Sequence, residues 1–567
     1  MPISGNPSFA RRFLVRSLPA LHPANPKPSS APTPSPNRAQ SVSPRQRPGN
    51  PTTAAAIDRA SIRGSRQVSI VRTDPYREVL PGARSSPYAA QVQADTPETS
   101  PLHPAFLAGV IEGFYGTPWS PAERVELFDW MARWGLNTYL YAPKDDLKHR
   151  LQWREPYSPP EAETLGKLIR ACQQRRLRFV FALSPGLDFR YRDAAELERL
   201  AERWSQMLAL GVQDFALLFD DIPDRLDPED LRPWGSLAAA QSHVATTVWR
   251  WTRERAPDAS LLFCPTAYCG RMAERQTGGP GYLETLGRQL APEIHVLWTG
   301  PEIVSRELTL PHVRAVTSLL RRKPLIWDNL HANDYDGHRF FCGPYSGRPP
   351  ELRQAVAGLL SNPNVEFPLN YVPLRTLAQF IHTETTWDSR RAYLSALAEW
   401  LPRFALVGAP LTREDIVFLA DCYYLPHEEG PKAEAFYQRT RDLLAREPAR
   451  WGVEADALRQ EAARLHHVCE RLPALRDRPL FHALNRRVWE LREELALLDR
   501  YVAARSADGQ ADQPCRSDFH LPGTYRGGLV ARLQRLLSLA PDGTFSPAVQ
   551  QIEPRTPPLE GARTADQ

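Results

Sequence analysis

Residues 106–143 read FLAGVIEGFYGTPWSPAERVELFDWMARWGLNTYLYAP and contain one strand, one helix and a second strand by their pattern. The flanking runs FLAGVIEG and NTYLYAP are short and rich in Val, Ile, Leu and aromatic residues, which is typical of buried strands. Between them, residues 121–135 have the apolar spacing of an amphipathic helix. Pro121 suits a first helical position and Gly135 suits a helix stop. The stretch therefore predicts that strands and helices alternate.

The same alternation continues along the chain. Six further strand candidates follow, all of them short apolar runs: RFVFALSP (178–185), DFALLFDD (214–221), SLLFCPTAY (260–268), IHVLWTG (294–300), PLIWDN (324–329) and VEFPLNYV (365–372). Helical patterns separate them, as in residues 160–175 and 194–211. Eight such units in about 280 residues have the size and pattern of a parallel (β/α)8 barrel. We therefore expect an α/β fold with a TIM barrel over residues 104–385.

A doubly wound open sheet is the competing architecture. That fold places a glycine-rich phosphate-binding turn after an early strand, and the sequence has none there.

Long helical patterns replace the strands after residue 385. They include DSRRAYLSALAEWLPRFA (388–405), GPKAEAFYQRTRDLLARE (430–447) and FHALNRRVWELREELALLDRYVA (481–503). We predict an all-α region over residues 386–542, followed by a disordered tail over residues 543–567, which is rich in Pro and Gly.

The basic charge of the chain is concentrated at its N-terminal end. Residues 1–57 contain seven Lys or Arg and no Asp or Glu, and the whole chain has a formal net charge of +5, so the remainder is near −2 (5 − 7). This distribution argues against nucleic-acid binding by the folded part. A segment rich in Pro, Ser, Ala and Arg cannot bury enough apolar surface to fold, so residues 1–103 are expected to be a disordered tail. Its acid-free start fits an organelle transit peptide or a start codon assigned too far upstream.

The seven cysteines are scattered and include no CxxC pair. A chain of this size does not need a disulfide framework, so we expect reduced cysteines and a cytoplasmic location. His466, His467 and Cys469 lie close together in a helical pattern without a second ligand pair, which favours a surface helix over a metal site. No run approaches the roughly 18 apolar residues that a membrane span requires, so no membrane partner is expected.

Adjacent carboxylates stand where a barrel would place its chemistry. Active sites of this fold lie at the carboxyl ends of the strands, and Asp220 and Asp221 directly follow the apolar run FALLF. Neighbours inside a strand point to opposite faces, but a turn just past the strand allows both to reach one substrate. Two carboxylates repel, and one is then easily kept protonated, as a general acid for glycoside cleavage must be. The alternative is that the pair forms a helix N-cap and a first-turn acid.

Other strand ends carry groups that suit a sugar. Trp327 and Tyr268 offer flat faces for a pyranose ring, and four short or cationic polar groups suit its hydroxyls: Lys144, Asn329, Asp334 and Asn362. Each has a plainer explanation. Trp327 fits a barrel core, and Lys144 has Asp145 and Asp146 beside it as ion-pair partners. Together at strand ends, these residues predict a carbohydrate pocket.

These motifs resemble glycoside hydrolase family 84, the O-GlcNAcase family. The similar segments in the barrel are GVIEGFYGTPWS (109–120), NTYLYAPKDDLKHRLQWRE (137–155), FALLFDDI (215–222), FCPTAYCG (263–270) and PLIWDNLHANDYD (324–336). Three later segments resemble the helical stalk of animal-type members: LADCYYLPHEEGPKAEAF (419–436), NRRVWELREELALLD (485–499) and YRGGLVARLQRLL (525–537). The resemblance covers about residues 104–540. One departure from the animal pattern is Ala267, beside Tyr268, where an acidic residue is expected, and this change is expected to alter the pocket rim or a supporting bond, and with it the leaving-group preference.

The resemblance implies a retaining, substrate-assisted mechanism, in which the 2-acetamido oxygen attacks the anomeric carbon and forms an oxazoline. In that scheme Asp220 orients the acetamido N–H, and Asp221 protonates the leaving oxygen and then activates water. Tyr268 bonds the acetamido oxygen. The remaining family positions surround the sugar: Tyr115, Trp327 and Cys264 at the N-acetyl pocket, and the Gly113 carbonyl, Lys144, Asn329, Asp334 and Asn362 at the ring hydroxyls. No cofactor is implied.

The function expected from the resemblance is removal of O-linked N-acetylglucosamine from Ser and Thr of proteins. The stalk similarity also implies a homodimer through the helical region. Two alternatives stay open: a β-N-acetylglucosaminidase that acts on glycans or hyaluronan-like polymers, and a catalytically silent glycan-binding protein on the same fold.

Overall fold

The computed structural model describes residues 103, 105–223, 227–384, 386–506 and 527–548. Almost all of the expected N-terminal tail, the end of the expected C-terminal tail and Cys515 lie outside these residues.

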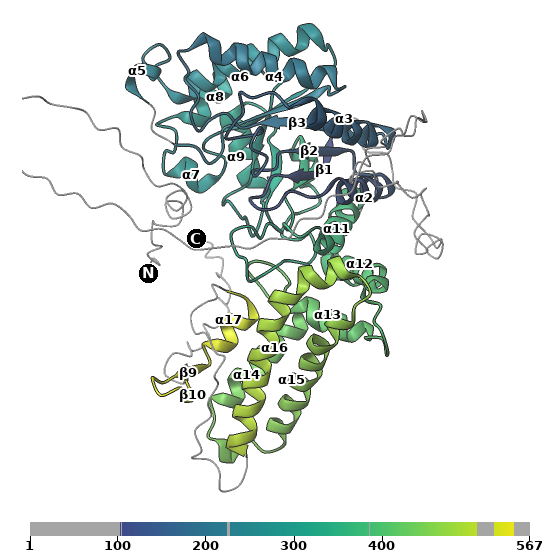
Figure 1. Ribbon diagram of the computed structural model, residues 1–567. Helices are drawn as coiled ribbons and strands as arrows, with labels where there is room; N and C mark the ends of the chain where they lie inside the picture. The colour runs from purple at the N-terminus through teal and green to yellow at the C-terminus, as the bar shows by residue number, and fades with distance from the viewer. Residues whose placement is uncertain (1–102, 104, 224–226, 385, 507–526, 549–567) are drawn as a thin grey trace, which may run out of the picture. The chain divides into compact units, whose positions relative to one another are not determined.

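Eight parallel strands close into a barrel, as the sequence predicts. The strands are β1 (Leu107–Glu112), β2 (Thr138–Tyr141), β3 (Arg178–Leu183), β4 (Asp214–Leu218), β5 (Leu261–Cys264), β6 (His295–Trp298), β7 (Leu325–Asp328) and β8 (Gly358–Ser361). Around them lie α2 (Pro121–Arg133), α3 (Pro159–Gln174), α4 (Ala194–Ala209), α5 (Pro228–Leu231), α6 (Leu237–Arg255), α7 (Gly270–Glu274), α8 (Tyr282–Gln289), α9 (Leu310–Leu320), α10 (Leu352–Ala355) and α11 (Tyr371–His382) (Figure 1). The register Leu107↔Gly358 closes the barrel between β1 and β8.

Alternate residues along each strand face the inside and the outside of the barrel, because successive side chains of a strand point in opposite directions. In β4, Phe215 and Leu217 belong to the main core cluster, which packs against the helices. Ala216 and Leu218 belong to a separate cluster that fills the barrel, together with inward residues of the other strands. This alternation decides which polar residue beyond each strand end faces the mouth of the barrel, the opening at the carboxyl ends of the strands.

The eighth strand is not where the sequence predicted it. Residues 365–372 form the 3-10 helix η1 (Phe367–Asn370) and the start of α11, whereas β8 is the short run Gly358–Ser361. Pro368 lacks the N–H that a central strand donates to its neighbour, which excludes this run from the barrel wall. A side chain at Gly358 would place its Cβ 2.1 Å from the Leu107 carbonyl oxygen, so the closing strand requires glycine there.

The helical region follows the barrel, as predicted. Its helices are α12 (Ser389–Trp400), η2 (Leu401–Phe404), α13 (Arg413–Asp421), α14 (Pro431–Leu444), η3 (Pro448–Arg450), α15 (Val453–Arg471), η4 (Leu472–Ala474), α16 (Arg478–Ser506) and α17 (Gly528–Gln534). The long helices α15 and α16 lie side by side (Figure 1). The chain also has a two-stranded antiparallel sheet, β9 (Leu537–Leu539) with β10 (Phe545–Pro547), which the sequence analysis did not predict.

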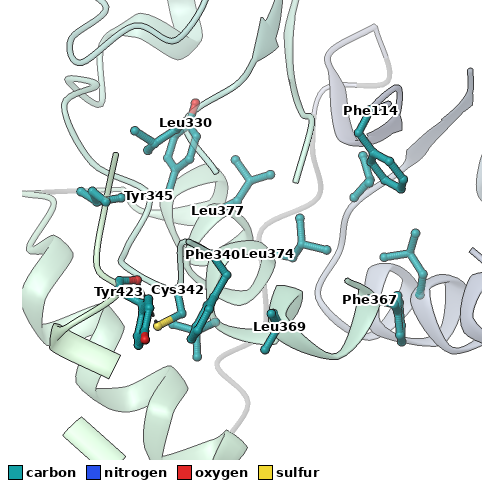
Figure 2. Packing of buried hydrophobic residues seen from close by; sticks show 14 of the residues in the cluster. Phe114, Leu330, Phe340, Cys342, Tyr345, Phe367, Leu369, Leu374, Leu377 and Tyr423 are labelled. Atoms are coloured by element: carbon teal, nitrogen blue, oxygen red, sulfur yellow. Dashed lines mark hydrogen bonds between the residues drawn. The ribbon is translucent and has the colours of Figure 1, made fainter. Parts of the chain in front are cut away.

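The long loop after β7 packs against this helical region. Figure 2 shows Phe340, Cys342 and Tyr423 together, and the Phe340 and Tyr423 rings stack with centroids 4.4 Å apart. The Tyr423 hydroxyl donates to the Arg487 carbonyl at 2.7 Å, and the Arg487 guanidinium lies 2.6 Å from the Glu366 carboxylate. Through these contacts the helices support the loops that leave β7 and β8. In the described part of the chain, no helix is long and apolar enough to cross a membrane.

Candidate active site

The carboxylates at the end of β4 occupy a sharp turn. The inside–outside alternation directs Asp220 inward, because Leu218 faces inward and Phe219 belongs to the outer core. Asp221 has a φ of 51°, in the left-handed region that residues other than glycine rarely adopt. The chain therefore turns at Asp221, as the sequence analysis required for two neighbours to reach one substrate. The alternative helix cap is wrong, since the next helix begins at Pro228 and is capped by Asp227.

Asp220 forms a buried ion pair with Lys144. Lys144 Nζ lies 2.5 Å from Asp220 Oδ2, and the two side chains are 2% and 9% exposed. Burial alone would raise the pKa of Asp220, but the charges of Lys144 and Arg150 outweigh it and hold the pKa below its usual value. Asp220 is therefore ionised at neutral pH. The idea that Lys144 pairs with Asp145 or Asp146 is wrong, because Lys144 follows β2 and pairs with Asp220 at the end of β4, two strands away.

The second oxygen of Asp220 is a free acceptor. Asp220 Oδ1 is buried and has no hydrogen-bond partner among the described residues. A buried anionic acceptor without a partner is costly, so this atom is suited to an N–H donor of a ligand.

Asp221 lies between two tyrosine hydroxyls. Tyr268 donates to Oδ1 at 2.8 Å and Tyr115 donates to Oδ2 at 3.1 Å. Burial, reinforced by the charge of Asp221, raises the pKa of both tyrosines, so both hydroxyls remain neutral donors. Tyr115 is 43% exposed, which places this carboxylate at the solvent side of the site. The adjacent acids thus differ in environment, one held by a cation and the other by neutral groups.

An indole and two amides form a connected wall. Trp327 Nε1–H donates to Asn329 Oδ1 at 2.9 Å, and Asn362 Nδ2–H donates to the same oxygen at 3.0 Å. Asn329 in turn donates to the Ile303 carbonyl at 2.9 Å. These side chains are on the inward positions of β7 and β8, and Asn362 Oδ1 has no partner in the described part of the structure. A Cβ on Gly113 would lie 2.5 Å from the Trp327 ring, so the end of β1 must carry glycine for the indole to fit.

The remaining predicted site residues border this wall. Asp334 accepts the main-chain N–H of Tyr115 at 2.9 Å, and burial raises the pKa of Asp334. Cys264 packs inside the barrel with Tyr268 and Trp327, and burial and the charge of Asp220 raise its thiol pKa well above the usual value. The structure thus brings all the predicted site residues to one mouth. Ala267 is fully buried in the outer core and not at the rim, so of the two effects expected from this departure only an altered supporting bond remains.

Sequence reasoning missed Arg150, which donates to the main-chain carbonyls of both acids. It also missed the fully buried pair of Arg348 with Asp328, whose carboxylate takes a further bond from Tyr345. Arg150 and Arg348 are far in sequence from the strand ends that they contact, so no spacing rule identifies them. The only signal in the sequence is that both are basic residues in the loops around the site. Within the described ranges, no group of three His, Cys, Asp or Glu is arranged to hold a metal ion.

A family model described as β-N-acetylglucosaminidase matches residues 108–406, more than half of the chain. Among curated proteins, the chain is 43% identical to a Protein O-GlcNAcase of Rattus norvegicus over 327 residues, which are 57% of this chain and 35% of that protein. It is 46% identical to a Protein O-GlcNAcase of Mus musculus over 273 residues, 48% of this chain and 30% of that protein. The matches therefore span about a third of the length of these relatives.

Solved structures give a similar result. An O-GlcNAc hydrolase of Thermobaculum terrenum, solved as a point mutant, is 30% identical to the chain and superposes with a TM-score of 0.63. The superposition covers 71% of this chain and 85% of that one.

Proposed function

Because the chain belongs to the β-N-acetylglucosaminidase family, glycoside hydrolase family 84, we propose that it removes O-linked N-acetylglucosamine from Ser and Thr side chains of proteins. The names of the relatives support this substrate. The observation that carries the chemistry is the pair of adjacent acids, Asp220 beside a buried lysine and Asp221 between two neutral hydroxyls. Their different surroundings fit two different roles.

In the proposed first step, the substrate supplies its own nucleophile. Ionised Asp220 accepts the acetamido N–H at its free Oδ1 and makes the amide oxygen more nucleophilic. That oxygen bonds to the anomeric carbon while the glycosidic C–O bond breaks, and Asp221 gives its proton to the leaving serine or threonine oxygen. The products of this step are an oxazolinium ion, whose N–H stays hydrogen-bonded to Asp220, and the protein with its free Ser or Thr hydroxyl.

In the second step, water opens the oxazolinium ion. Asp221, now a carboxylate, takes a proton from the water as its oxygen bonds to the anomeric carbon, and the amide is restored. Two inversions at the same carbon give net retention. Tyr268, kept neutral by burial, donates to the acetamido oxygen as its charge changes.

The other residues are proposed to hold the sugar. Trp327 and Cys264 line the N-acetyl pocket, with Tyr115 beside it. The ring hydroxyls are bound by a set of short polar groups and one main-chain carbonyl: Lys144, Asn329, Asp334, Asn362 and the carbonyl of Gly113. The free Oδ1 of Asn362 supports this assignment, because it lacks a partner among the described residues.

The test is hydrolysis of an aryl β-N-acetylglucosaminide and the matching β-glucoside over a pH series. The proposal expects turnover of the acetamido sugar alone, unaffected by chelators, and loss of that turnover in Asp220→Asn and Asp221→Asn. Equal turnover of both sugars contradicts the oxazoline route. Turnover of neither supports a silent glycan-binding protein.

The natural aglycone needs its own comparison. The enzyme should release N-acetylglucosamine from a modified protein faster than from chito-oligosaccharides or hyaluronan-like polymers, and the reverse order supports the glycan alternative. We also propose a homodimer through the helical region, supported by the stalk-like sequence segments, and a cytoplasmic location, supported by the six described cysteines, which are free thiols. Light scattering of the purified protein measures the oligomeric state, and a monomeric mass contradicts the dimer.

A further inference from the structure

Arg150 is a buried cation whose only part in the chemistry proposed above is the effect of its charge on Asp220. It is 7% exposed and lies on the loop between β2 and α3. Its Nη2 donates to the Asp221 carbonyl at 2.8 Å, and its Nη1 faces the Asp220 carbonyl at 3.5 Å and donates to Ser184 Oγ at 2.9 Å. One guanidinium thus spans the main chain of both acids and the end of β3.

We propose that Arg150 is the positioning residue of the acid pair, holding the left-handed turn at Asp221 so that both carboxylates face the same substrate. This inference rests on the proposed function. Asp221 needs such support because its φ of 51° is unfavourable for a residue with a Cβ. Peptide groups are planar, so fixing the carbonyls of residues 220 and 221 also fixes the direction of the Asp221 side chain.

Arg150 can impose this geometry because its own loop is anchored. The Ser184 main-chain N–H donates to the His149 carbonyl at 2.9 Å, and the His149 ring contacts the Ala182 carbonyl at 2.8 Å. On the other side of the loop, fully buried Arg203 donates to the Lys148 carbonyl at 2.9 Å. The loop is therefore tied to β3 and α4, and the Arg150 side chain projects from a rigid base.

The shape and the charge of Arg150 have separable effects. Its planar guanidinium donates hydrogen bonds in two fixed directions at once, and the single ammonium group of lysine does not reproduce this geometry. Its charge, after that of Lys144, helps to keep Asp220 ionised by lowering its pKa. Arg150→Lys removes this geometry and keeps the charge, whereas Arg150→Met removes both.

Comparing kcat/KM for glycosides whose leaving groups differ in acidity distinguishes a misplaced Asp221 from a general loss of active-site structure. A poor leaving group needs the proton of Asp221, and a dinitrophenolate needs little help. In both variants kcat/KM should fall about 10²-fold for a methylumbelliferyl or alkyl glycoside, chiefly through kcat, and less than about tenfold for a dinitrophenyl glycoside. The acidic limb of the pH profile should move to higher pH in Arg150→Met only, because loss of the cation raises the pKa of Asp220.

Arg154→Met is the matched control. Arg154 lies on the same loop, but its side chain pairs with Asp188 at 2.6 Å and Glu196 at 2.8 Å instead of contacting Asp220 or Asp221. Any fall in kcat/KM that Arg154→Met causes by disturbing the loop should be by the same factor for all leaving groups. If the Arg150 variants also lose activity equally for all leaving groups, or keep full activity, the positioning role is rejected.

A structural readout decides the inference independently of turnover. The crystal structure of Arg150→Lys or Arg150→Met should show Asp221 outside the left-handed region or its carboxylate rotated from both tyrosines. An unchanged turn contradicts the inference, whatever the rates. Failure of the proposed function has a different signature, since the unsubstituted protein then fails to hydrolyse any N-acetylglucosaminide.

Discussion

At the scale of single residues, the site depends on how the neighbours Asp220 and Asp221 come to differ. Both follow the same strand, but the alternation of β4 directs the first into the barrel towards Lys144, and the left-handed turn directs the second towards the tyrosines. The carboxylate of Asp220 pairs with a buried cation and remains ionised, while the carboxylate of Asp221 accepts hydrogen bonds from two neutral hydroxyls. Position along one strand therefore separates two chemically identical side chains.

Lys144→Met should move the acidic limb of kcat/KM to higher pH. Without the ammonium, burial remains the largest influence on Asp220 and raises its pKa, so the ionised form that the reaction needs appears only at higher pH. Activity at neutral pH should fall at least about 10²-fold, since Lys144 is also proposed to bind substrate. Lys148→Met is the control, because Lys148 pairs with Glu161 outside the site. An unshifted limb contradicts the role of the ion pair.

Gly113→Ala should damage the pocket more than the fold. The new methyl group would lie 2.5 Å from the Trp327 ring, so the indole must move and its bond to Asn329 should weaken. Such overpacking costs about 1–3 kcal/mol of stability. We expect a raised KM with the melting temperature lowered by a few degrees. Gly337→Ala is the control, because its Cβ would meet nothing within 4 Å. Equal KM values in the two variants reject the steric explanation.

At the scale of elements, outward-facing acids at strand ends anchor the loops that carry the site. Asp328, between inward Trp327 and Asn329, receives two bonds from Arg348 at 2.8 and 2.7 Å. The same guanidinium donates to the Ser305 carbonyl at 2.9 Å. The loop after β6 is thereby fixed to the end of β7. Asp328 thus supports the pocket without facing it. From the sequence alone, a polar residue at a strand end that supports the pocket looks the same as one that contacts the substrate.

Arg348→Met should destabilise the protein by about 3–5 kcal/mol, because it leaves a buried carboxylate without its partner. Burial alone raises the pKa of Asp328, and Arg348 lowers it below the usual value. A depressed folded pKa means that this stability is present above the unfolded pKa of about 3.9 and is lost as pH falls through the folded pKa. Urea unfolding at several pH values measures this.

The double variant Asp328→Asn with Arg348→Met is the companion measurement. It removes the stranded charge, so it should lose less stability than Arg348→Met alone. If the stability lost in the double variant equals the sum of the losses in Asp328→Asn alone and Arg348→Met alone, the two side chains do not stabilise each other.

At the scale of the whole molecule, the described barrel and helices form one compact unit. Stacked Phe340 and Tyr423 and the pair of Arg487 with Glu366 join the loops at the barrel mouth to α13 and α16. Because these contacts are buried or partly buried, melting of the helical region should expose apolar surface of the barrel loops.

Calorimetry should therefore show a single unfolding transition for both parts. Tyr423→Ala should lower that transition by removing the stack and the bond to the Arg487 carbonyl, a loss of about 3 kcal/mol. Val453→Ala is the control, because Val453 is 83% exposed. Two separate transitions, one for the barrel and one for the helices, are the result that contradicts this coupling.

The sequence by itself determined what depends on neighbours along the chain. Strand and helix periods, Pro121 at the start of α2 and the acids after FALLF are local patterns, so they predict the barrel and the place of its chemistry. These patterns also picked most of the pocket residues, and the motif resemblance then added Gly113, Tyr115 and Cys264 and the role of each residue. The local pattern failed at the eighth strand, because the longer apolar run 365–372 was preferred to the run 358–361, which begins with a glycine, a residue depleted in strands.

Only the tertiary structure decided the contacts between residues far apart in the chain. Lys144 meets Asp220 across 76 positions, and Arg150 reaches the carbonyls of the acid pair from a loop two strands away. Closure of the barrel creates these encounters, because it brings the carboxyl ends of all eight strands to one rim. Asp220 stays ionised because long-range pairing with cations overcomes the effect of burial, and no local period encodes such pairing.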